Sequence, residues 1–229
     1  VSTGGGIRDM YGAKMRDHNW SRGGCGTINM VKIMEKSSNI GVSVIINKFY
    51  SRQPEKYVEG LYRLGLHDDL RLPIVGYATP KIRMPQKNGR GNYTNWPATT
   101  IPWMSIGYET QIPPISTVTF YNAIANGGKM MRPRFVKEIR KDGEVIQSFP
   151  PEVMREQIAK PSTVEKITKV LTSVVSRGTG KKAGSKAFAV AGKTGTAQIS
   201  KGKAGYKSGA MHYLISFCGF FPADNPEYT

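Results

Sequence analysis

The interpretation of this chain starts from residues 191–197, which read Ala191-Gly192-Lys193-Thr194-Gly195-Thr196-Ala197. A short alternating run over residues 186–190 precedes them, and a turn rich in Gly, Lys and Ser follows over 200–210. Alternation that ends in turn residues predicts a strand leading into a hairpin. Glycines weaken a strand, so they need a reason, and one reason is the close approach of an extended peptide to the strand edge.

The side chains of this stretch are suited to binding an anionic group. Lys193 would supply a positive charge for a substrate carboxylate, and Thr194 and Thr196 would add hydroxyls that donate and accept hydrogen bonds. The alternative is a glycine-containing surface hairpin with a solvated lysine. A lone Lys-Thr-Gly string recurs by chance, so the stretch predicts a site only if it has partners elsewhere in the chain.

Composition narrows the class of protein. The chain has 229 residues, 39% of them hydrophobic, which is enough for a real core and excludes a wholly disordered chain. Lys and Arg number 33 against 16 Asp and Glu, giving a net charge of +17 that suggests an anionic partner. The basic residues are scattered, however, and no helix interleaves them with aromatics. We therefore predict no nucleic-acid partner and attribute the charge to solubility.

The cysteines and histidines do not indicate a metal site or a redox site. Cys25 and Cys218 lie far apart and outside any metal-like spacing, and the sequence leaves open whether they form a disulfide. Cys218 lies in an apolar run, which predicts a buried thiol. The histidines His18, His67 and His212 show no ligand spacing, so we predict no metal and no cofactor. The sequence shows neither a signal peptide nor an apolar run that could span a bilayer.

Apolar spacing predicts the helices. They are expected over residues 27–36, 40–50, 54–66, 118–126 and 161–176. Their expected N-terminal caps are Thr27, then Ser116 or Thr117, and finally Ser162 with Glu165 in a capping box. Residues 67–100 are rich in Pro and Gly and predict a long irregular loop, which is often functional.

The remaining segments predict strands. Residues 135–149 alternate around Asp142-Gly143, a strong hairpin signal, and 213–221 read as a central strand. Helices followed by antiparallel strands predict an α+β fold with helices packed on an antiparallel sheet. We expect one domain over 1–229, with a helical part over about 27–130 and a sheet-forming part over about 131–229.

Three polar residues, Ser37-Ser38-Asn39, separate the first two apolar helices. A junction between two such helices should be buried, and buried polar groups need partners. The alternative is simple capping of the second helix by Ser38 or Asn39, since these residue types are preferred as N-caps.

Taken together, these segments resemble a known family. Ser37-x-Asn39 and the distant Lys193-Thr194-Gly195 are similar to two of the three motifs of penicillin-binding proteins and serine β-lactamases. The wider runs at 36–43, 122–128 and 192–197 resemble class B penicillin-binding proteins, and Ser-Asn-Ile-Gly-Val leans toward the cell-division type. The resemblance covers nearly the whole chain. It implies a penicillin-binding-protein-like α+β fold, incomplete at both ends.

The resemblance also implies an activity and a set of catalytic residues. The activity is that of a D,D-transpeptidase, which cross-links peptidoglycan stem peptides through an acyl-serine intermediate. Ser37 would relay protons, and Asn39 would bind the substrate amide and the family's catalytic lysine. Lys193 would sustain a positive potential. The backbone N–H of Thr196 would form half of an oxyanion hole, where one donor contributes about 3 kcal/mol.

Substrate binding is implied for the neighbouring positions. Thr194, Gly195 and Thr196 would hold the carboxylate of the donor peptide. Because all these roles belong to one cleft, the junction at Asn39 must face the strand that carries Lys193. The assignment would be wrong if these residues lay on opposite sides of the molecule.

Two departures from the family pattern stand out. The family nucleophile belongs to a Ser-x-x-Lys motif, and none precedes Ser37. Ser200-Lys201-Gly202-Lys203 fits the string but follows the Lys-Thr-Gly strand, so we interpret it as a coincidence. In Gly107-Tyr108-Glu109 a glutamate stands where relatives often carry a second glycine. We expect a fragment that is inactive alone, with the nucleophile and the last strand and helix of the fold outside it.

The resemblance further implies partners and a location. The partners would be peptidoglycan stem peptides, β-lactam antibiotics and the cell-division machinery. The location would be the periplasmic face of the inner membrane, with an anchor upstream. Two alternatives stay open: a β-lactamase or β-lactam sensor of the same fold, and a non-catalytic relative that holds peptidoglycan or an assembly partner.

Overall fold

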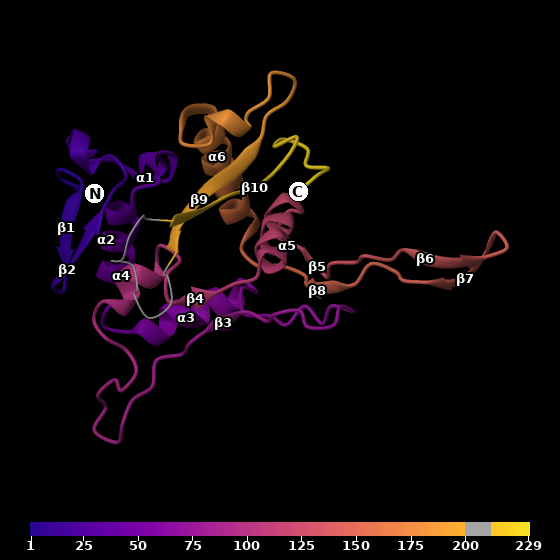
Figure 1. The fold of residues 1–229 in the computed structure, drawn as a ribbon, viewed down its shortest axis with the longest axis horizontal. Coiled ribbons are helices and arrows are strands. Elements are labelled where there is room, and N and C mark those ends of the chain that lie inside the picture. The colour runs from indigo at the N-terminus through magenta and orange to yellow at the C-terminus, as the bar shows by residue number, and fades with distance from the viewer. Residues whose placement is uncertain (200–211) are drawn as a thin grey trace.

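The computed structural model describes residues 1–199 and 212–229 (Figure 1). Its helices are α1 (Met30–Lys36), α2 (Asn39–Tyr50), α3 (Pro54–Arg63), α4 (Thr100–Met104) and α5 (Pro114–Ala125), followed by α6 (Pro161–Arg177) and the 3-10 turns η1 (Trp20–Arg22) and η2 (Lys181–Ala183). Its strands are β1 (Ile7–Met10), β2 (Ala13–Arg16), β3 (Lys81–Ile82), β4 (Thr110–Gln111), β5 (Met130–Met131), β6 (Glu138–Lys141), β7 (Glu144–Ser148), β8 (Val153–Arg155), β9 (Ala191–Ile199) and β10 (His212–Phe220). The Ser200–Lys203 string and the turn over 200–210 lie outside the described residues.

All five predicted helices are present; α3 and α6 begin at the predicted residues, whereas α1, α2 and α5 begin at Met30, Asn39 and Pro114. Asn29, not Thr27, caps α1, and its side chain accepts from the N–H of Lys32. Both α5 and α6 begin with a proline, which needs no hydrogen bond for its nitrogen and has a helical φ angle already set. The predicted caps on these two helices, including the capping box at Ser162, are therefore wrong.

The strand that carries Lys193 begins later than predicted. Residues 186–190 are not part of β9, which starts at Ala191 and pairs antiparallel with β10 over its whole length. The glycines of β9 have a visible cause. A Cβ on Gly192 would lie 2.4 Å from the Phe217 ring, and one on Gly195 would lie 2.4 Å from the Ser216 hydroxyl. The side chains of β10 thus occupy the space that larger residues would need.

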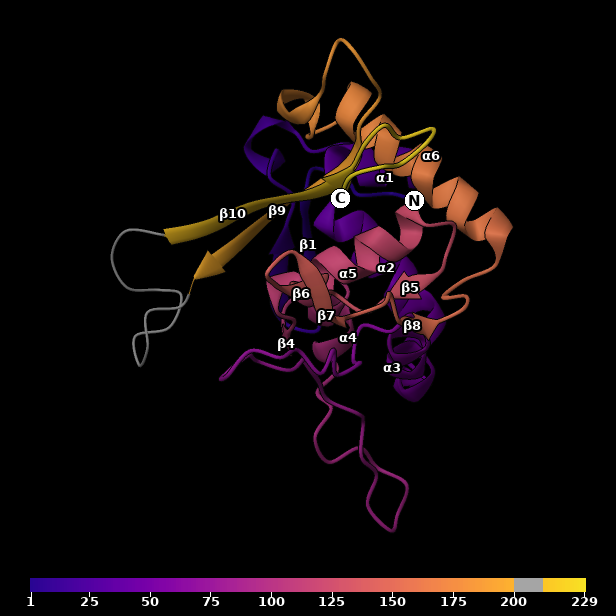
Figure 2. The ribbon, with the colours of Figure 1, turned by 90° about the vertical axis from the view of Figure 1, so that its right-hand side faces the viewer.

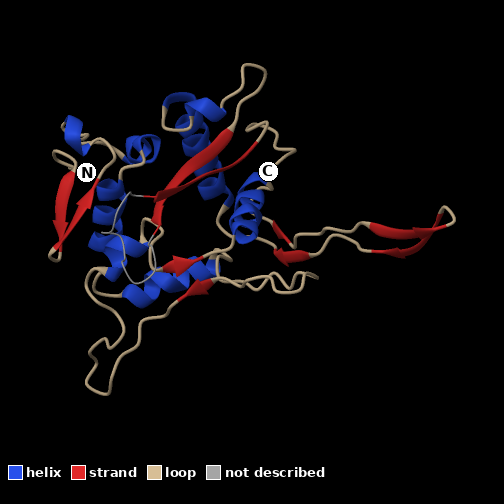
Figure 3. Cartoon of the chain, in the orientation of Figure 1, coloured by secondary structure: helices blue, strands red, loops and turns tan. Residues whose placement is uncertain are grey.

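The strands pair in twos. Among the described residues the pairs are β1–β2, β3–β4, β5–β8, β6–β7 and β9–β10, all antiparallel. The predicted hairpin over 135–149 is confirmed as β6–β7, and it projects away from the rest of the molecule (Figures 1 and 3). Asp142 and Gly143 both have positive φ angles, 52° and 88°, as a two-residue hairpin turn requires.

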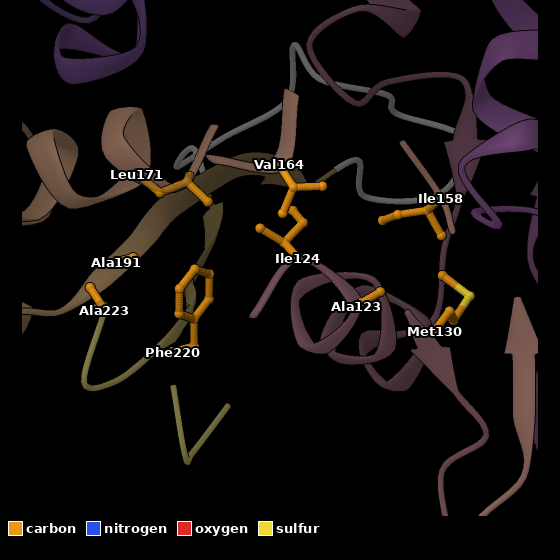
Figure 4. Packing of buried hydrophobic residues seen from close by; sticks show 9 residues of the cluster. All are labelled: Ala123, Ile124, Met130, Ile158, Val164, Leu171, Ala191, Phe220 and Ala223. Atoms are coloured by element: carbon orange, nitrogen blue, oxygen red, sulfur yellow. The ribbon is translucent and has the colours of Figure 1, made fainter. Parts of the chain in front are cut away.

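One hydrophobic cluster holds the β9–β10 pair in place. It joins α5 and α6 to the two strands, with Phe220 fully buried among Ile124, Leu171 and Ala191 (Figure 4). Helix α6 packs along β9 and α5 packs against β10, and Figure 2 shows the pair crossing beside α6. This packing confirms the predicted combination of helices with antiparallel strands. In the described part of the chain, none of the helices has the length and apolar character needed to cross a bilayer.

The long segment after α3 is only partly irregular. Strand β3 pairs with β4, and Trp96 is buried in a second cluster with Val58 of α3 and Ile101 of α4. Near the base of the segment, Lys87 forms an ion pair with Glu55 at 2.7 Å. The segment is thus attached to α3 at several points.

We predict that Gly41→Ala destabilises the chain. A Cβ on Gly41 would lie 2.6 Å from Cγ1 of Ile33, which is fully buried and has no room to move. Overpacking of this kind costs about 1–3 kcal/mol, more than the gain in helix propensity. Gly60→Ala in α3 is the matched control, because its Cβ would meet only the end of Arg63, at 3.8 Å. Urea unfolding should show loss of stability for Gly41→Ala and none for Gly60→Ala; equal changes would contradict the prediction.

Candidate active site

Ser37 occupies a sharp turn between α1 and α2. Its φ and ψ angles are 52° and 46°, the left-handed conformation usually taken by glycine. The N–H groups of Ser37 and Ser38 donate to the carbonyls of Met34 and Ile33, at 3.1 and 2.9 Å, which closes the end of α1. A serine in this conformation is strained, and such strain gathers at functional sites.

The Ser37–Asn39 junction was expected either to be buried or to cap α2, and Ser38 does both. Ser38 is 1% exposed and caps α2, because its Oγ accepts from the N–H of Gly41 at 3.0 Å. The same hydroxyl donates to Oδ2 of Asp17 at 2.7 Å. Oδ1 of Asp17 accepts from the N–H of Ile40 at 3.0 Å. A buried carboxylate from the segment after β2 therefore fixes the junction, a role that the sequence did not reveal.

Lys193 meets Ser37 across 156 positions of sequence. Its Nζ donates to Oγ of Ser37 at 2.7 Å and to the carbonyl of Thr194 at 3.1 Å. Burial of the amine lowers the pKa of Lys193 from 10.5 to about 8. An amine with such a pKa can both donate and accept a proton near neutral pH. The Ser37 hydroxyl, which is hydrogen-bonded to this amine, could carry that proton to or from a substrate.

A further hydroxyl joins the site from the bend after α6. Oγ1 of Thr179 lies 3.0 Å from Oγ1 of Thr194, and either atom could donate. Sequence reasoning missed Thr179. In the sequence Thr179 stands in the string Gly178-Thr179-Gly180, which by itself is typical of a helix end. The two threonines provide adjacent donors of the kind that bind a carboxylate.

The chain also matches the model of a known protein family. The model of the penicillin binding protein transpeptidase domain matches residues 5–229. The chain belongs to this transpeptidase domain family. The predicted likeness to class B penicillin-binding proteins, and the α+β fold that it implied, are confirmed.

Curated relatives carry corresponding names. A peptidoglycan D,D-transpeptidase FtsI homolog of Mesostigma viride is 27% identical over 218 residues, which are 88% of this chain and 34% of the relative. Stage V sporulation protein D of Bacillus subtilis is 29% identical over 227 residues, which are 97% of this chain and 32% of the relative. The chain thus spans about a third of the length of the curated relatives it matches.

Solved structures show the same fold. The transpeptidase domain of penicillin-binding protein 3 from Burkholderia pseudomallei, in its apo form, is 29% identical with a TM-score of 0.76, covering 99% of this chain and 60% of that one. Penicillin-binding protein 3 from Mycobacterium tuberculosis, complexed with aztreonam, is 26% identical with a TM-score of 0.76. This match covers 97% of this chain and 48% of that one.

One edge of β9 faces away from β10, and it is open in the sense that no strand among the described residues pairs with it. The N–H of Gln198 donates to the hydroxyl of Tyr108 at 3.3 Å, so it points to that edge. Because N–H groups two residues apart point to the same side of a strand, the N–H of Thr196 lies on the open edge as well. An oxyanion donor would need to point to this side, and the role of Thr196 stays a prediction.

Asn39 and Gly195 complete the set of predicted residues. Asn39 is the first residue of α2, and its Nδ2 donates to the carbonyl of Arg16 at 3.0 Å. Gly195 lies on β9 opposite Ser216. Asn39 follows Ser37, the partner of Lys193, by two positions in the sequence. The roles of Asn39 and Gly195 stay predictions. Both cysteines are free, and Cys218 is only partly buried, not fully buried as predicted; this partial burial raises its pKa to about 11.

The lowered pKa of Lys193 predicts a pH-dependent stability. Between about pH 8 and 10.5 the unfolded chain binds the proton that the folded Lys193 has lost, so the free energy of unfolding rises with pH in that window. Below pH 8 both states are protonated and this dependence ends. Lys193→Met removes the titrating group, so the unfolding free energy of the wild type minus that of the variant should rise from pH 8 to 10.5. A constant difference in urea unfolding would contradict the prediction.

Proposed function

We propose that the protein acts as a peptidoglycan D,D-transpeptidase that joins stem peptides through an acyl-serine intermediate. The observation that carries the proposal is the 2.7 Å contact between Nζ of Lys193 and Oγ of Ser37. Two motifs that are far apart in sequence meet there, at the edge of a strand that could pair with an extended peptide. The curated relatives named as D,D-transpeptidases support the same activity.

The chemistry assigns a task to each group. A serine from the Ser-x-x-Lys motif of the longer parent protein, rather than Ser200 of this chain, would attack the terminal peptide bond of the donor stem. The bond breaks, and the leaving amine of D-alanine takes up a proton. Ser37 and Lys193 would pass that proton, and in the second step they would accept one from the attacking amine of the acceptor stem.

The remaining residues would bind and stabilise. The backbone N–H of Thr196 would donate to the oxyanion of each tetrahedral intermediate. The hydroxyls of Thr194 and Thr179 would hold the terminal carboxylate of the donor. Asn39 would hydrogen-bond the donor amide. These roles need no metal or cofactor.

The family suggests ligands and a location as well. Because a relative was solved in complex with aztreonam, we propose that β-lactams acylate the same serine in the protein. We also propose a membrane-anchored protein acting at the periplasmic face, in contact with cell-division proteins, since relatives carry the FtsI name.

The test uses a longer form of the protein that includes the Ser-x-x-Lys segment. It should become covalently labelled by a fluorescent penicillin and release the label slowly. It should also release D-alanine from an acyl-D-Ala-D-Ala donor when an amine acceptor is added. Rapid loss of the label would identify a β-lactamase instead. Complete lack of labelling with retained peptidoglycan binding would identify a non-catalytic relative.

A further inference from the structure

A buried carboxylate lies behind the site, where α1 packs against α6. Glu35 stands two residues before Ser37, and its side chain is 2% exposed. Lys32 donates to Oε2 at 2.6 Å and the hydroxyl of Ser173 donates to Oε1. Nε of Arg177 lies 3.6 Å from Oε1. The hydrogen bond from Lys32, followed by that from Ser173, lowers the pKa of Glu35, so the group is an anion at neutral pH.

The backbone of Glu35 also binds the segment that follows α6. Its carbonyl accepts from the N–H of Thr179 at 2.9 Å. A Cβ on Gly178 would lie 2.4 Å from this carbonyl oxygen, so only glycine allows the end of α6 to come so close. Side chain and main chain of one residue therefore bind the last turn of α6 and the bend that follows it.

Both segments tied together at Glu35 lead directly into the site. On one side Ser37 reaches Lys193, and on the other Thr179 reaches Thr194. We propose that Glu35 is a positioning residue, which sets the place of the Ser37 and Thr179 hydroxyls relative to β9. Its effect on Lys193 is indirect: the contacts of the Glu35 carboxylate with Ser173 and Arg177 fix where α1 lies against α6. The inference rests on the proposed function only in that this placement matters for acyl transfer.

The test measures the pKa of Lys193 by NMR of the lysine side chains in the 229-residue chain. Glu35→Gln keeps the volume but loses the charge that attracts Arg177 and strengthens the hydrogen bond from Ser173, both on α6. Helix α1 should then shift from α6, and water should reach Nζ of Lys193. The pKa should then rise from about 8 toward 10.5, by about one unit or more. Glu35→Asp should restore part of the difference. Ser173→Ala, which removes one partner but keeps the charge, should raise the pKa as well.

Glu165→Gln is the matched control. It makes the same chemical change on the exposed side of α6, where Glu165 pairs only with Lys169 at 2.5 Å in the described structure. The pKa of Lys193 should not change there. An unchanged or lowered pKa in folded Glu35→Gln would overturn the proposal, even if its melting temperature falls. If Glu35→Gln does not fold, Ser173→Ala decides by the same readout. No step of the test uses acyl transfer, so its failure is separate from failure of the proposed function.

Discussion

Replacing Lys193 by alanine is expected to slow acylation of the longer protein by penicillin on the order of 100-fold or more. The change removes the donor to Ser37 and the half-buried positive charge at the edge of β9. Groups placed where charge develops in a water-excluded site contribute about 3–4 kcal/mol to the transition state, which corresponds to this loss. No other lysine in the described part of the chain donates to Ser37.

The second-order rate constant of labelling by a fluorescent penicillin measures the effect. Lys169→Ala is the control, because it makes the same change in charge on the exposed surface of α6. Lys193→Arg would keep the charge but change the length and geometry of the donor, so partial activity is expected. Labelling of Lys193→Ala within a few-fold of the wild type would show that the Ser37–Lys193 contact does not serve catalysis.

Replacing Asp17 by alanine is expected to destabilise the chain by about 3 kcal/mol. Asp17 is 1% exposed and accepts two hydrogen bonds, from the Ser38 hydroxyl and from the N–H of Ile40. Hydrogen bonds to a charged group contribute about 1.5–3 kcal/mol each, and removing one partner leaves the other groups buried and unpaired. The junction that carries Ser37 would lose its anchor to the segment after β2.

Urea or thermal unfolding of the chain measures this loss. Asp9→Ala serves as the control, since Asp9 is an exposed carboxylate close by that accepts only from the N–H of Gly12, at 2.9 Å. Its removal should cost about 1 kcal/mol or less. Equal losses for the two variants would mean that Asp17 does not hold the junction.

Much of the fold could be predicted because its signals are local. The spacing of apolar residues revealed the helices, and Asp142-Gly143 revealed the β6–β7 hairpin, since its two positive φ angles need such residues. The errors arose where two local signals compete. A proline opens α5 and α6 without the predicted side-chain caps, and the alternation over 186–190 did not extend β9.

Only some residues of the candidate site could be identified from the sequence. Residue types and motif order were sufficient to select Ser37, Asn39, Lys193 and the threonines of β9, and to indicate the family. Nothing local marks Glu35, Asp17 or Thr179, because their partners lie elsewhere in the chain: Ser173 is 138 positions from Glu35, and Ser38 is 21 from Asp17. Such contacts depend on how α1, α2 and α6 pack against β9, and packing is a property of all the intervening elements at once. The local sequence pattern was therefore enough to identify the candidate site residues. The distances between them, and the buried residues that hold them in place, depend on the tertiary structure.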